Sequence, residues 1–200
     1  MNERLPWPLV LDAYQLELIG AWQRRVEADE GPAVEVTALR GEQRVGAAAV
    51  LLDPPGARRV AAALAAVGAW VASRQAEAML VVWHDAQLHG ALECDCQWPG
   101  RLCALRVCPG GCCVDYYPAA IEGAGPLQTA SWQTIGSTRD PQPTLPVVML
   151  DLLAAWRTGG HSPWRRSGAR RKLIGLGVEL STDLLSAIRM DAAPTPAAGR

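Results

Sequence analysis

Apolar and polar positions along the chain follow two periods, one typical of helices and the other typical of strands. Over residues 57–75 apolar side chains recur every three or four positions. The four residues before this stretch, Asp53-Pro54-Pro55-Gly56, combine an acid with two prolines, as helix starts often do. Over 12–28 the apolar positions fit a strand nearly as well as a helix. The predicted helices are 12–28, 57–75, 145–157, 168–176 and 181–190.

Shorter apolar runs predict strands, and two pairs of them predict hairpins. The segments 34–39 and 44–52 are joined by the short connection Gly41-Glu42-Gln43, which favours a first hairpin. A second hairpin is predicted around Cys108-Pro109-Gly110-Gly111, because Pro followed by Gly suits the two middle positions of a tight turn. The run Met79–Trp83 is apolar throughout, as a central strand would be. The predicted strands are 34–39, 44–52, 79–83, 88–94, 101–107, 112–117 and 129–135.

This order of elements predicts an α+β fold, in which a mainly antiparallel sheet is packed by two or more helices and followed by a small helical C-terminal extension. We expect an α+β core domain over 1–160, with a cysteine-rich hairpin region at 94–113. A basic helical extension is expected over 161–190. Residues 191–200 are rich in Ala and Pro and are expected to form a disordered tail.

Composition narrows the class of protein. Half of the residues are apolar and a fifth are charged, as in folded domains. No apolar run reaches the roughly 20 residues that a membrane-spanning helix needs, and the first residues do not read as a secretory signal. We therefore expect a cytoplasmic protein without a membrane partner. Because 18 of the 19 basic residues are arginine, arginine abundance alone is weak evidence for phosphate binding.

All six cysteines lie between residues 94 and 113. In a chain without a secretion signal, such a cluster favours metal binding or redox chemistry over structural disulfides. On a strand, Cys94 and Cys96 would share one face, and Cys108 and Cys112 would sit nearly opposite each other across the turn. These four thiolates predict a zinc site. Inert buried thiols are the competing interpretation, and redox or disulfide use is the third.

The segment between Asp151 and Glu179 contains no acid and six basic residues. Basic side chains beside a tryptophan can follow a phosphate backbone while the indole stacks on a base. The opposing interpretation is a solvated basic face, or one neutralised by the acidic N-terminal part that holds Glu27, Asp29 and Glu30. The residues expected to contact nucleic acid are Trp164, Arg165, Arg166, Arg170, Arg171 and Lys172.

Together these patterns predict a non-enzymatic binding protein, stabilised by zinc at the cysteines and contacting nucleic acid through its basic segment. An alternative is a phage or mobile-element structural or assembly protein that binds a protein partner or a second copy of itself. A small Cys-dependent enzyme is the third class, in which His84 or His89 would pair with Cys94 or Cys96. In that class, His84 and Asp85 would supply a general base.

Overall fold

The computed structural model describes residues 7–94, 100–109, 111–118, 128–132, 145–159 and 166–180. Its helices are α1 (Trp7–Glu27), α2 (Ala57–Ser73), α3 (Asp85–Ala91), α4 (Val147–Thr158) and α5 (Arg166–Gly175). Its strands are β1 (Ala33–Arg40), β2 (Gln43–Leu51), β3 (Ala78–His84), β4 (Arg101–Cys108), β5 (Gly111–Pro118), β6 (Gln128–Trp132) and β7 (Val178–Leu180).

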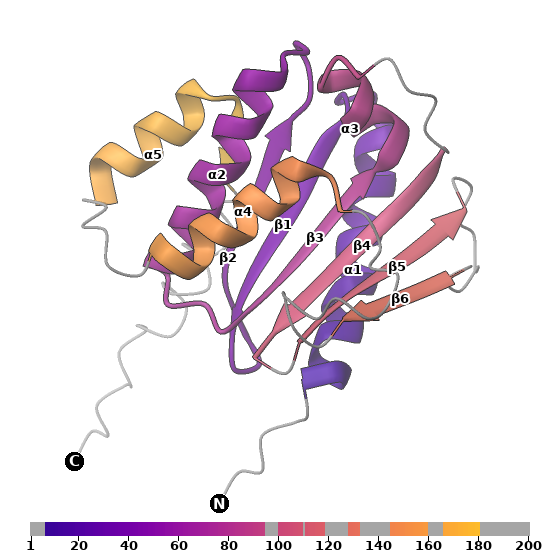
Figure 1. The fold of residues 1–200 in the computed structure, drawn as a ribbon, viewed down its shortest axis with the longest axis vertical. Helices are drawn as coiled ribbons and strands as arrows, with labels where there is room; N and C mark the ends of the chain where they lie inside the picture. Colours follow the sequence, from indigo (N-terminus) through magenta and orange to yellow (C-terminus); the bar gives the residue numbers. More distant parts are fainter. Residues whose placement is uncertain are drawn as a thin grey trace, which may run out of the picture.

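The strands form one sheet in the order β6-β5-β4-β3-β1-β2-β7, and every neighbouring pair is antiparallel (Figure 1). The hairpins β1–β2 and β4–β5 connect neighbours in the sequence, while β3 stands between them. This arrangement confirms the predicted α+β class and the mainly antiparallel sheet. The segment expected as a helical extension also adds β7 to the sheet, at the outer edge of β2.

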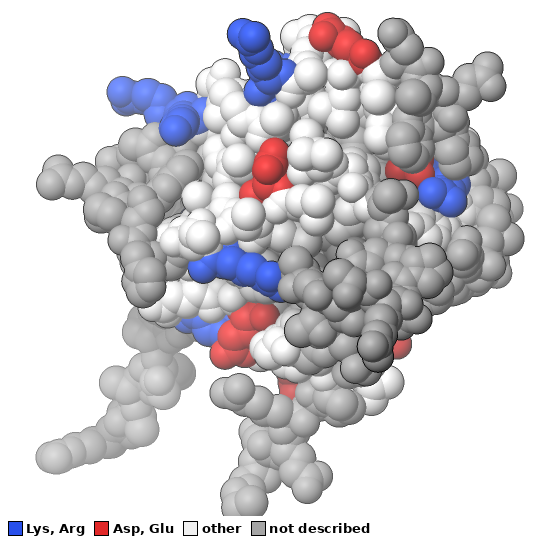
Figure 2. Space-filling view, viewed as in Figure 1, with Lys and Arg blue, Asp and Glu red and all other residues white. Residues whose placement is uncertain are grey.

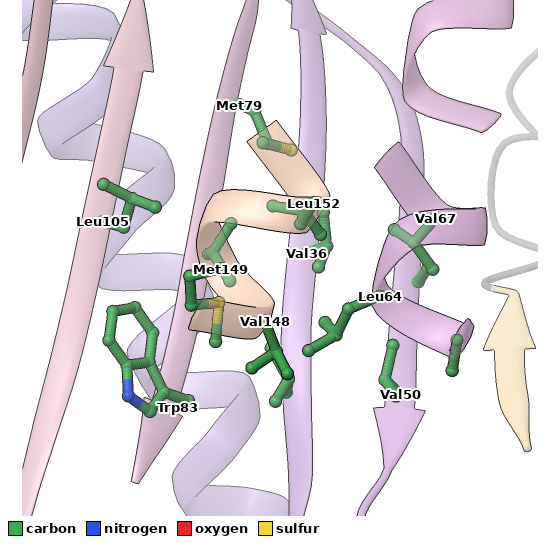
Figure 3. Close-up of a cluster of buried hydrophobic side chains, with 14 of the residues drawn as sticks. Val36, Val50, Leu64, Val67, Met79, Trp83, Leu105, Val148, Met149 and Leu152 are labelled. Atoms are coloured by element: carbon green, nitrogen blue, oxygen red, sulfur yellow. The ribbon is translucent and has the colours of Figure 1, made fainter. Parts of the chain in front are cut away.

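Helices cover both faces of the sheet (Figure 1). On one face, α2 and α4 bury apolar side chains such as Leu64 and Leu152 against Val36 and Met79 of the central strands (Figure 3). On the other face, α1 buries side chains such as Trp22 against Leu80 and its neighbours. Because successive strand residues point to opposite faces, an apolar run such as that of β3 supplies both cores at once.

The predicted strand over 88–94 is wrong, because helix α3 occupies Asp85–Ala91. The side chain of His84 caps this helix: its Nδ1 accepts a hydrogen bond from the backbone N–H of Gln87 at 3.4 Å. Leu88 is fully buried and fixes the short helix on the sheet. Among the described helices, none combines the length and the apolar character needed to cross a membrane.

Candidate functional site

The predicted zinc ligands do not come together in the described part of the chain. Cys108 is opposite Gly111 and Cys112 is opposite Val107, so the two cysteines, expected to be nearly opposite each other, are offset by one position. The two side chains consequently point to opposite faces, Cys112 into the core under α2 and α4 and Cys108 toward the core under α1.

Cys94 lies at the other end of the β4–β5 hairpin. Its backbone N–H donates to the carbonyl of His89 at 3.1 Å, next to α3, and it is exposed. A β4 strand of eight residues separates this end from Cys108, which at about 3.4 Å per residue is far beyond the reach of one metal ion. Cys96 lies outside the described residues. Among the residues that the structure describes, no three His, Cys, Asp or Glu side chains are grouped as metal ligands.

Three of the thiols are held in their protonated form by burial. Removal from water raises the pKa of Cys103, of Cys112 and of Cys113. For Cys113 this cost outweighs the attraction of the neighbouring guanidinium of Arg106. Since the thiolate is the nucleophile and the metal ligand, these three side chains behave as small apolar groups at neutral pH.

Two buried carboxylates lie beside the thiols, and both are engaged by arginine. Asp115 accepts hydrogen bonds from Gln15 Nε2 at 2.9 Å and from Arg106, beneath α1. Asp85 accepts from Trp83 Nε1 and from Arg101 Nε, each at 2.9 Å. In these contacts the buried carboxylates neutralise part-buried arginines and satisfy buried donors, so their first role is to hold the fold together.

The two histidines suggested for acid–base chemistry lie at the same end of the sheet as Asp85. Burial lowers the pKa of His84 and of His89, against the attraction of Asp85, so both rings are neutral at pH 7. The ring of His84 stacks on Trp22 with a centroid separation of 5.9 Å. With Nδ1 of His84 capping α3 and one ring face against Trp22, this histidine serves the packing of α1 on the sheet.

The structure describes the side chains of three of the six residues that are expected to contact nucleic acid. Arg170, Arg171 and Lys172 are exposed on α5, whereas Trp164, Arg165 and the side chain of Arg166 lie outside the described residues. Figure 2 shows basic side chains at the corner of the molecule where α5 lies, beside a largely uncharged surface over α2 and α4. The structure therefore presents α5 as an exposed basic helix.

The acidic N-terminal part does not neutralise the arginines of α5 among the residues that can be described. Glu30 is 3.8 Å from Arg25, within the same N-terminal part. No described ion pair joins Arg170 or Arg171 to Glu27, Asp29 or Glu30. The acid closest to this region in the sequence, Glu179, is bound by Arg25 at 2.6 Å.

An arginine of α2 anchors the C-terminal end of α5 to the body of the protein. Arg59 of α2 donates to the carbonyl of Leu176 at 3.2 Å and to that of Leu51 at 2.9 Å. Gly177 follows with a φ of 76°, and a Cβ there would lie 2.8 Å from Nη1 of Arg59. The sequence alone does not reveal this anchor. Arg58 and Arg59 are neighbours at the start of the same helix, and the sequence does not show which of them bonds to backbone carbonyls.

Comparison with known proteins adds no further guide to the site. No protein-family model matches the chain, and neither a curated protein nor a solved structure matches it.

Proposed function

We propose that the protein is a non-enzymatic binding protein that contacts nucleic acid through the basic helix α5. The observation that carries this proposal is the exposure of Arg170, Arg171 and Lys172 on consecutive positions of one helix. Phosphate backbones are bound by exposed Arg and Lys side chains that release condensed counterions.

The internal chemistry of the fold supports binding over catalysis. Cys103, Cys112 and Cys113 have pKa values raised by burial, which disfavours the thiolate that a Cys-dependent enzyme needs. Asp85 and Asp115 are each bound to an arginine. The polar groups around the cysteines are therefore occupied in stabilising the fold.

Salt-dependent binding tests the proposal. The full chain is titrated into a labelled mixture of single- and double-stranded oligonucleotides, and affinity is measured by fluorescence anisotropy from low to high salt. We expect log Kd to rise linearly with log salt, with a slope of roughly 0.7 to 0.9 per neutralised phosphate. The double variant R170A/R171A should weaken binding, while R24A, which changes an exposed arginine on α1, should not. Absence of binding at low salt, or equal losses in both variants, would refute the proposal.

A protein-interaction role is the second candidate, and a specific surface favours it. Val147 is 71% exposed and Leu150 is 43% exposed on the outer side of α4. Their surroundings over α2 and α4 carry few charges (Figure 2). If this surface associates with a second copy, sedimentation velocity should show a concentration-dependent dimer that V147E/L150E abolishes.

A further inference from the structure

Over residues 170–175, where the side chains of helix α5 are described, the helix is fixed on the protein body through Leu173. Leu173 is completely buried in the core under α2 and α4, while its neighbours Arg170, Arg171 and Lys172 are exposed. The helix ends where Arg59 binds the carbonyl of Leu176, and β7 then joins the sheet. The helix is thus held in one orientation, and in its described part the side chains around Leu173 are exposed.

The order of the three basic residues places them around that exposed part of the helix. Successive residues of an α-helix are about 100° apart. Arg171 therefore points about 160° away from the buried Leu173, which makes it the outermost side chain. Arg170 and Lys172 project about 100° to either side of Arg171. The helix carries one cation on the side that faces away from the protein and one on each flank.

This arrangement fits the major groove of DNA. The groove of B-form DNA is about 12 Å wide and admits an α-helix, with phosphates on both walls and base edges on the floor. The cation on each flank can contact the phosphates of one wall. The outward-facing Arg171 can reach the floor, where its guanidinium can bond O6 and N7 of guanine. The major groove of double-stranded RNA is too deep and narrow for this contact.

Single strands fit α5 less well. Proteins that bind single strands stack the bases on aromatic side chains beside the basic groove. The ten residues of α5, Arg166–Gly175, include no aromatic residue, and Trp164, the residue expected to stack on a base, precedes the helix and lies outside the described residues. Ile174, on the described part of the helix, is apolar and 58% exposed, which suits contact with a thymine methyl group.

We propose that the ligand of α5 is double-stranded DNA, with α5 in the major groove, Arg171 at the base edges and Arg170 and Lys172 at the two phosphate walls. This inference rests on the proposed nucleic-acid function and specifies the class of nucleic acid and the role of each side chain. It separates Arg171, which specifies sequence, from Arg170, which positions the helix.

Binding of the full chain to matched oligonucleotides tests the class of ligand. The probes are a 20-base-pair DNA duplex pool of random sequence, either strand pool alone, and an RNA duplex pool of the same length. We expect the DNA duplex to bind most tightly. Tighter binding of single strands or of the RNA duplex would overturn this inference and leave the proposed function standing. Failure to bind any of the probes would overturn both.

Two single variants test the roles of the side chains. Sequences selected from the duplex pool by wild-type protein should share a guanine that R171A no longer prefers, with a loss of discrimination of roughly 5- to 150-fold. R170A should weaken all duplexes alike and reduce the salt slope by about one. R24A serves as a control on another helix. If R171A and R170A lower affinity equally for every sequence, the groove assignment is wrong.

Discussion

The guanidinium of Arg106 lies 3.1 Å from the carboxylate of Asp115, whose side chain is only 4% exposed. Removing one partner from a buried ion pair leaves an uncompensated charge, which typically costs about 3–5 kcal/mol. We therefore expect R106M to lower the free energy of unfolding by about 3–5 kcal/mol. The variant also removes the hydrogen bonds from Arg106 to Asp12 at 2.5 Å and to Cys113 at 3.4 Å. Urea denaturation followed by tryptophan fluorescence measures the loss.

Two controls distinguish the buried pair from its exposed neighbour. Asp12 has a side chain 57% exposed, so D12N should cost no more than about 1 kcal/mol. The double variant R106M/D115L removes both buried charges and should recover much of the stability lost in R106M. If R106M and D12N prove equally mild, Arg106 does not neutralise Asp115 in the way described.

Thiol alkylation should separate the cysteines by their surroundings. Cys94 is exposed, so iodoacetamide at pH 8 should modify it rapidly in the native protein. Cys103 is completely buried and its pKa is raised by burial, so it should react only when the protein unfolds. Peptide mass spectrometry against time follows each site. Rapid native labelling of Cys103 would show that the sheet opens far more readily than its packing indicates.

Acid should weaken the fold through His89, which is buried, and His84, which is part-buried. Burial lowers the pKa of His84 and of His89 below the usual value of about 6.5, so the unfolded chain binds protons first as the pH falls. Stability conferred by the neutral rings is complete above about pH 6.5 and declines as the pH drops toward the lowered values. In H84N the new amide oxygen can still cap α3, but one of these titrations is lost.

Denaturation at pH 7.5 and at pH 5.5 measures this dependence. The loss of stability between the two should be smaller in H84N than in wild type, and smaller again in H84N/H89N. An unchanged loss in the double variant would assign the acid sensitivity to carboxylates.

Helices α2 and α4 can pack closely because Gly68 has no side chain. A Cβ built there points directly at the carbonyl oxygen of Leu152 and lies 3.1 Å from Cβ of Ala155. Although alanine is the better helix former by about 1 kcal/mol, we expect G68A to destabilise by about 1–3 kcal/mol or more, because the helices must separate. Gly90, in α3, has no atom within 4 Å of the corresponding position, so G90A should be neutral or stabilising. Thermal melts of the two variants make the comparison, and equal melting temperatures would contradict it.

The sequence predicts most of the fold, because the elements with strong periodicity also bury strongly. The predicted helix 57–75 is close to α2, and the predicted pair 34–39 and 44–52 is close to β1 and β2. The errors fall where local pattern is weak. Residues 88–94 are too few to show a helical period, and α3 depends on a histidine cap and on burial of Leu88. The three residues of β7 depend on an edge of β2 that is distant in the sequence.

The candidate site was less predictable, because it depends on register. A shift of one position in the β4–β5 turn moves a side chain to the opposite face, so Cys108 and Cys112 separate although the hairpin itself was predicted correctly. The exposure of Arg170 and Arg171 agrees with the sequence pattern. A helix that buries one apolar residue leaves its arginines exposed, whatever the register of the sheet. The anchoring arginine, Arg59, acts through backbone carbonyls, which carry no residue-specific signal.

The late position of β7 in the chain has a consequence for aggregation. Strand β2 presents Ala48, Ala49 and Val50 to β7, and until residues 178–180 are made this stretch is an unpaired edge of small apolar residues. Such edges pair readily with strands of other molecules. β7 covers it with a strand of only three residues, whose centre is the charged and exposed Glu179. A chain truncated after Gly159 should therefore form sheet-rich aggregates, detectable by light scattering and thioflavin T fluorescence, whereas the full chain should not.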